Sequence, residues 1–160
     1  MTATPFRWAL ECVKNLEELA ERGTIEADDP LETYYKRATR AAIMVSEEGL
    51  PITLAFLASR GSKDPGTLLA YHLAAYINHV VLPEEEPDWP ELRRECFDLP
   101  DDAEELRERV RDEVREALTE LARREGPHEM PNIESQVLDL LNTVKRVAEG
   151  WHKIAKFGGD

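Results

Sequence analysis

A heptad-type apolar repeat near the C-terminus constrains the fold more than any other feature of the chain. Its members are separated alternately by four and three positions: Ile133, Val137, Leu140, Val144, Val147, Trp151 and Ile154. This spacing places all of them on one face of a single long helix, with Asn132 as the expected N-cap. Either the same chain or a neighbouring chain must cover that face, and we expect burial within the same chain.

Start and stop signals divide the preceding sequence into further helices. A capping residue followed by proline, the usual beginning of a helix, occurs at Thr4–Pro5, Asp29–Pro30 and Asp64–Pro65. Glycine ends three of the apolar stretches, at Gly23, Gly49 and Gly61. The mostly apolar segment between Gly49 and Gly61 predicts a short buried helix.

Residues 83–131 predict a loop followed by a long acidic helix. Four prolines within residues 83–100 leave room for one short helical piece near 90–97. Asp101 or Asp102 then caps a helix that reaches about Glu125. No strand pattern occurs, and 160 residues suit one domain. We therefore expect an all-α bundle of five to seven helices that forms a single domain over residues 1–160.

The charge is strongly negative and unevenly distributed. A net charge of −13 argues against a general nucleic-acid binder, because phosphate contacts require Lys and Arg. Residues 81–129 hold 18 acidic and 8 basic residues, whereas residues 33–66 hold 5 basic and 3 acidic ones. Residues 142–160 hold 4 basic and 2 acidic residues. Two modestly basic segments are therefore embedded in an acidic protein.

The sequence predicts a cytoplasmic protein without a membrane segment. No apolar run approaches the roughly 20 residues that a spanning helix requires, and the N-terminus does not resemble a signal peptide. The two cysteines, Cys12 and Cys96, have no partner at a metal-binding spacing. We expect both thiols to be reduced and buried as small apolar groups.

Metal chemistry is the main enzymatic alternative. His72 and His79 are seven residues apart on one expected helix, about 10.5 Å along its axis, which is too far for one metal ion. The acidic string Glu17, Glu18 and Glu21 resembles part of the metal motif of all-α nucleotide pyrophosphohydrolases of the MazG type. Its second carboxylate motif is not found on a second helix. Solvated acidic faces are the simpler interpretation, so we expect no metal and no other cofactor.

The basic segments supply the candidates for contact with a phosphate backbone. Eight residues are of interest, and ion pairing with the abundant acid is the alternative role for each: Arg37, Arg40, Arg60, Lys63, Lys145, Arg146, Lys153 and Lys156. We expect no aromatic residue to be interleaved with them on the binding surface. This pattern favours contact with a phosphate backbone over recognition of bases.

Residues 49–61, GLPITLAFLASRG, carry a family resemblance. They resemble the central signature of the small helical subunit of type III-B CRISPR effector complexes, the Cmr family. In that family a basic and apolar helix leads through an Asn-Gly-Leu turn into a helix containing Thr-Leu-Ala-Phe-Leu. Here Gly49–Leu50 and Thr53–Leu57 occupy these places, and Glu48 stands where asparagine is usual.

Two later segments extend the resemblance. Residues 68–81 are similar to the next helix of the family, and residues 140–148 resemble its last helix, although Thr143 and Val147 stand where the family usually has aromatics. Residues 83–131 have no counterpart in this comparison, and we predict that they are an acidic insertion.

The resemblance implies a non-catalytic, all-α subunit that works in antiviral defence. Its partners would be the other Cmr subunits, stacked copies of itself, and the guide and target RNA. By position, Lys145 and Arg146 fall on the basic pair of the family, and Arg37 and Arg60 fall near its other basic positions. The remaining four candidates rest on the charge map alone. A protein-interaction bundle that contacts no RNA is a further alternative.

Overall fold

The computed structural model describes residues 2–158, with side chains described as far as residue 154. This part of the chain forms helices and no strand, which confirms the all-α expectation. The elements, in chain order, are α1 (Pro5–Glu21), α2 (Pro30–Glu48), α3 (Leu50–Ala58), α4 (Pro65–Tyr76), the π-helical segment η1 (Ile77–Val81), α5 (Trp89–Phe97), α6 (Ala103–Ala122) and α7 (Glu129–Gly158).

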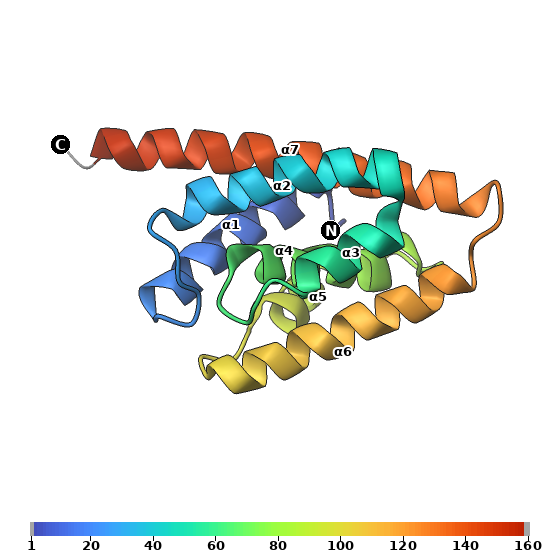
Figure 1. The fold of residues 1–160 in the computed structure, drawn as a ribbon, viewed down its shortest axis with the longest axis horizontal. Coiled ribbons are helices and arrows are strands. Elements are labelled where there is room, and N and C mark those ends of the chain that lie inside the picture. The colour runs from blue at the N-terminus through green and yellow to red at the C-terminus, as the bar shows by residue number, and fades with distance from the viewer. Residues whose placement is uncertain (1, 159–160) are drawn as a thin grey trace.

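Helix α4 is the centre of the molecule. Residues 67–80 carry no charge, and every residue of α4 is buried. A helix that is apolar on all sides must be surrounded by other elements, and α4 contacts α1, α2, α3 and α6. In Figure 1 it lies between the layer formed by α1, α2 and α7 and the long helix α6 on the opposite side.

Helix α7 covers α1 and α2 and runs the length of the molecule (Figure 1). The first four residues of the predicted heptad seam are buried within the same chain, as expected. The expectation is wrong for Ile154, which is 70% exposed, because α7 continues past the end of the bundle. The predicted N-cap at Asn132 is also wrong. The helix begins at Glu129 and takes Pro131 into its first turn, where a missing N–H costs no intrahelical hydrogen bond.

Helix α3 is only partly buried, which corrects the expectation of a buried helix between Gly49 and Gly61. It packs against α2, α4 and α6 through one side, which carries Leu50, Leu54 and Leu57. Its outer side leaves Ile52 53% exposed and Phe56 37% exposed. A helix at the edge of a bundle can bury only the face that meets its neighbours. Part of the family-like segment Thr53–Leu57 therefore lies on the surface.

Residues 83–131 form part of the core. Helices α5 and α6 lie close to their predicted positions, although α6 ends at Ala122 rather than near Glu125. The apolar stripe of α6 is buried against α3 and α4: Leu106, Val110, Val114, Ala117 and Leu121. At η1, Asn78 and His79 contact Glu113 of α6 at 3.0 and 3.1 Å. That this segment is an insertion relative to the family stays a prediction.

A buried polar network crosses the core at His72. The Tyr34 hydroxyl lies 2.7 Å from Nδ1 of His72, and the Asn15 side-chain oxygen lies 2.9 Å from its Nε2. The Asn15 amide nitrogen donates to the Phe97 carbonyl, so its oxygen faces the histidine. Because that oxygen can only accept, Nε2 carries the proton and Nδ1 accepts from Tyr34. All three polar side chains are therefore satisfied while buried.

The two cysteines are buried and free, as expected. Burial raises the pKa of the Cys96 thiol to about 12, which removes its thiolate form at neutral pH. Neither cysteine offers an activated nucleophile.

The burial of His72 predicts a loss of stability in acid. Burial lowers the pKa of His72 from 6.5 to about 3, so between these values the unfolded chain binds a proton that the folded protein does not. Stability therefore falls as the pH decreases through this interval, by about 1.4 kcal/mol per pH unit from this group. Urea unfolding at several pH values should show a shallower dependence in His72→Gln. The matched control His128→Gln changes an exposed loop histidine and should keep the wild-type slope. Parallel curves for wild type and His72→Gln would contradict this assignment.

Candidate nucleic-acid interface

Arg37 and Arg60 meet at a single carboxylate where α2, α3 and α4 come together. Arg37 donates two hydrogen bonds of 3.2 Å to the two oxygens of Asp64. Nε of Arg60 lies 3.8 Å from Oδ1 of the same side chain. Asp64 also caps α4 by accepting a 2.7 Å hydrogen bond from the N–H of Gly66. Two guanidinium groups thus share one carboxylate, which leaves the cluster with a net positive charge.

Gly66 permits the close packing of this cluster. A Cβ atom at this position would lie 2.9 Å from Oδ1 of Asp64 and 3.2 Å from Cδ of each arginine. A larger residue would therefore displace the carboxylate or the arginines. The sequence Asp64-Pro65-Gly66 thus begins the central helix and also makes space for the arginine pair.

The arginines determine the ionisation of Asp64. Partial burial by itself raises the pKa of the carboxyl group, but hydrogen bonds from Arg37 and Gly66 and the charge of Arg60 outweigh that effect. The pKa of Asp64 consequently lies below its ordinary value, and the side chain is charged at neutral pH.

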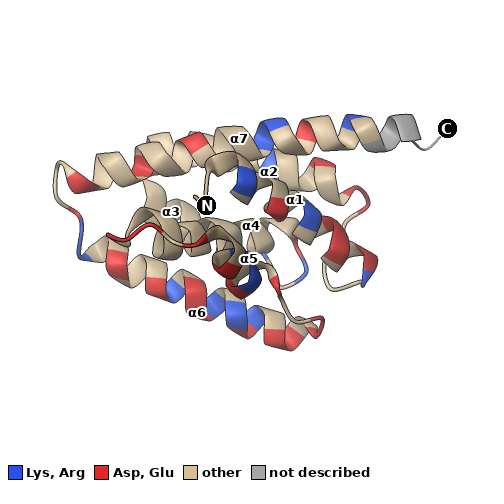
Figure 2. Ribbon diagram, turned by 180° about the vertical axis from the view of Figure 1, so that it is seen from behind, with Lys and Arg blue, Asp and Glu red and all other residues tan. Residues whose placement is uncertain are grey.

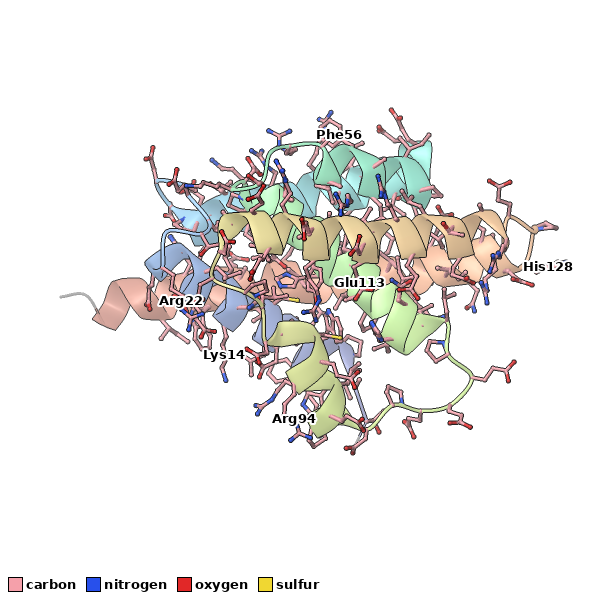
Figure 3. All side chains as sticks on the ribbon, turned by 90° about the horizontal axis from the view of Figure 1, so that it is seen from below. Lys14, Arg22, Phe56, Arg94, Glu113 and His128 are labelled. Carbon is pink, nitrogen blue, oxygen red and sulfur yellow. The ribbon has the colours of Figure 1, made fainter. Side chains whose placement is uncertain are left out.

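An aromatic side chain belongs to the same surface. The Arg60 guanidinium lies 5.6 Å from the centre of the Phe56 ring, a cation–π distance. Figure 3 shows Phe56 at the outer edge of the molecule. Its spacing of four residues from Arg60 places the two side chains on one helical face. The expectation that no aromatic accompanies the basic residues is wrong at Arg60, because Phe56 stands four residues before it and its ring meets the guanidinium.

The two basic segments lie side by side in the fold. Helices α2 and α7 run antiparallel. Two contacts near their ends show which residues lie opposite each other: His152 contacts Asp29 at 2.8 Å, and Glu134 accepts a hydrogen bond of 2.8 Å from the N–H of Leu50. With about 1.5 Å of rise per residue in both helices, residues 36–40 lie level with roughly residues 142–146. Sequence reasoning had identified both segments but had no means of placing them together.

The side of α7 that carries Lys145 faces α2. Glu149, one turn further along α7, lines a cavity of about 260 Å³ together with Glu32 and Tyr35 of α2. Lys36 and Arg40 are exposed on the adjoining turns of α2. We use the name α2 basic face for the surface formed by Lys36, Arg37, Arg40, Arg60, Lys145 and Arg146.

The candidates differ in how their charges are balanced. Lys63 pairs with Glu26 at 3.0 Å and Lys153 pairs with Glu149 at 3.3 Å, so for these two the alternative of ion pairing applies. Within the described side chains, no acidic partner within 4.0 Å is found for Arg40, Lys145 or Arg146. The side chain of Lys156 lies outside the described residues. In Figure 2 the basic bands of α7 lie in its C-terminal half.

The described part of the chain offers no metal site. It contains no group of three or more His, Cys, Asp or Glu side chains arranged to hold a metal ion. No helix within the described residues is long and apolar enough to cross a bilayer.

A family model described as CRISPR-associated protein (Cas_Cmr5) matches residues 6–151, which include every helix up to most of α7. The chain belongs to the Cas_Cmr5 family. It is therefore a small subunit of the type III-B, or Cmr, class of CRISPR-associated proteins, and it associates with other Cmr subunits. No curated protein and no solved structure shows a significant match to it.

The shared carboxylate predicts an unusual gain of binding. Asp64→Asn keeps an effective helix cap but removes one negative charge from between two arginines. If the cluster contacts phosphate, a Cmr complex carrying this variant should bind a labelled target RNA roughly two- to fivefold more tightly at low salt, a typical effect for a partly screened ion pair. Asp101→Asn, which removes an exposed partner of Arg22, should leave the affinity unchanged. Equal or weaker binding by Asp64→Asn would exclude the cluster from the interface.

Proposed function

We propose that this chain is a non-catalytic subunit that holds guide and target RNA in place within a cytoplasmic type III-B complex for antiviral defence. The observation that carries the proposal is the α2 basic face. Residues from the two basic segments of a chain with net charge −13 lie on one side of the bundle, and several have no acidic partner among the described side chains. The other Cmr subunits, and stacked copies of this chain, would complete the RNA channel.

The arrangement of charge explains how an acidic protein can serve this role. Helix α6 carries seven acidic residues against four arginines and lies on the opposite side of α4 from α2 and α7 (Figure 1). A helix is about 10 Å across, and screening at physiological ionic strength has a length of about 8 Å. One intervening helix is therefore enough to weaken the repulsion between the acidic residues of α6 and RNA on the α2 basic face.

The chemistry of the face favours contact with the backbone. Arginine presents a planar fork that matches phosphate oxygens, and lysine acts as a point charge. Helical RNA is recognised mainly by its shape and its backbone, because side chains cannot read its deep major groove. Phe56 adds one exposed aromatic surface beside Arg60 on which a base could stack.

The pyrophosphohydrolase alternative gains no support from the geometry. Two carboxylates of the acidic strings are already engaged, since Glu17 accepts a hydrogen bond from Trp151 and Asp29 contacts His152. The protein-interaction alternative has an observation in its favour, because Ile43, Ile52 and Phe56 are exposed on α2 and α3. Such residues suit contacts with neighbouring subunits, which the proposed role also requires.

Purification from the native host tests the role directly. A tagged copy isolated under gentle conditions should carry short RNAs with CRISPR repeat tags, together with the large effector subunits. A nucleotide panel with Mg²⁺ serves as the control for the enzymatic alternative and should yield no pyrophosphate. Absence of such RNA from cells that express their CRISPR arrays would contradict the proposal.

The residues are tested by charge reversal. The double variant Lys145→Glu, Arg146→Glu should weaken target-RNA binding by the complex. The plot of log affinity against log salt concentration should also become less steep, by about one unit for each phosphate that the variant no longer contacts. The circular-dichroism signal should stay unchanged, because neither residue belongs to the core. Arg93→Glu with Arg94→Glu is the matched control, since Arg94 lies far from Phe56 (Figure 3). Unchanged binding by the first pair at matched salt would remove both residues from the interface.

A further inference from the structure

A second basic site is formed by the acidic helix α6. A groove of about 450 Å³ lies between α6 and the end of α3 with the loop that follows it. Arg107, Arg111 and Arg115 line the wall formed by α6, and Ser59 and Ser62 line the opposite wall. The sequence did not reveal this site, because the net charge of the segment conceals how its charges are arranged around the helix.

Helix α6 holds three of its arginines in one row beside its buried stripe, with Glu104 and Glu108 exposed along the outer edge of that row. Arg107, Arg111 and Arg115 follow one another at intervals of four residues, so they form one row on the side of the helix toward α3. Glu113 and Glu120 belong to the other side, where Glu113 contacts η1. Figure 3 shows Glu113 on the side of α6 that faces away from Phe56. The groove is therefore basic although the segment as a whole is acidic.

The charge of the row is poorly compensated. Among the described side chains, Arg107 and Arg115 have no acidic partner within 4.0 Å, and Arg111 has only its neighbour Asp112 at 3.6 Å. Like charges at i and i+4 destabilise an isolated helix by about 0.2–0.5 kcal/mol per pair. The chain has 33 acidic residues, yet none of those described neutralises the whole row. An arginine row of this kind beside a groove suits an external anion.

We propose that this groove binds successive phosphates of a single RNA strand, at a site that adjoins the α2 basic face. Neighbouring arginines of the row are about 6 Å apart along the axis, which suits consecutive phosphates of one extended strand. Arginine matches phosphate with two parallel hydrogen bonds, and the two serine hydroxyls can contact the same backbone from the other wall. Val110 and Val114 form an apolar floor that suits sugars rather than charged groups.

A strand in this groove would lie beyond the guide–target duplex. The groove adjoins the α2 basic face, because Ser59 and Gly61, which line the groove, stand on either side of Arg60 in the sequence. The arginines form a single row, which matches the phosphates of one strand, so the ligand would be a single-stranded flank of the target RNA. This inference rests on the proposed function, which supplies the RNA.

The test uses the assembled complex and two target RNAs, one that ends with the guide-paired region and one with a single-stranded extension. The variant Arg107→Gln, Arg111→Gln, Arg115→Gln should bind the extended RNA about tenfold more weakly and leave the short RNA unaffected. Because three contacts to a single strand are lost, the plot of log affinity against log salt concentration should become less steep by about 2. The control Arg93→Gln, Arg94→Gln, Arg123→Gln makes the same change in net charge outside the groove and should bind like wild type.

The outcomes separate this inference from the proposed function. Wild-type affinity of the groove variant for the extended RNA would overturn the groove but leave the function intact. Equal weakening for both RNAs, or loss of the variant subunit from the complex, would indicate a protein contact and would also overturn it. Ultraviolet crosslinking of the wild-type complex provides a second readout. Adducts on residues 107–115 support the groove, adducts only on α2 or α7 overturn it, and no adduct on this chain contradicts both proposals.

Discussion

The fold depends on the complete burial of one uncharged helix. All twelve residues of α4 are buried, so the other helices must enclose it on every side. This requirement places α1, α2 and α7 on one side and α6 on the other, and it thereby separates the α2 basic face from the acidic helix. The distribution of charge that the proposed function needs is therefore a consequence of how the core is covered. Polar side chains of this helix are tolerated where they have hydrogen-bond partners, as at His72, where Tyr34 and Asn15 satisfy both ring nitrogens.

The sequence predicts much of this architecture because its helices are marked locally. Capping residues with proline identify the beginnings of α1, α2 and α4, and the heptad spacing identifies the buried side of α7. The incorrect predictions concern how the helices are placed relative to one another. Ile154 continues the apolar pattern but lies where α7 has run past the bundle, and Phe56 lies on the outer side of a helix at the edge. Periodicity shows which residues share a side of a helix, but it does not show where the neighbouring helices end.

The candidate sites show the same distinction. Sequence reasoning selected Arg37 and Arg60 but did not predict that they share Asp64, because Arg37 belongs to α2 and meets the loop that carries Arg60 and Asp64 only in the fold. It passed over the arginines of α6 because their segment is acidic in total. A projection around the helix axis would have shown Arg107, Arg111 and Arg115 in one row beside the buried stripe. Summed charge therefore predicts solubility and long-range repulsion, whereas the pattern around each helix predicts local binding.

Asp64 connects the surface with the core. Its carboxylate holds two surface arginines and also caps the helix that the whole bundle encloses. A phosphate that recruits Arg37 or Arg60 would compete with Asp64 for their hydrogen bonds, and the carboxylate would then rely on the cap alone. On the proposed function, RNA binding and the stability of the first turn of α4 would thus be thermodynamically linked through one side chain. Amide hydrogen exchange at the start of α4 would accordingly report on whether the surface is occupied, although no ligand reaches the core.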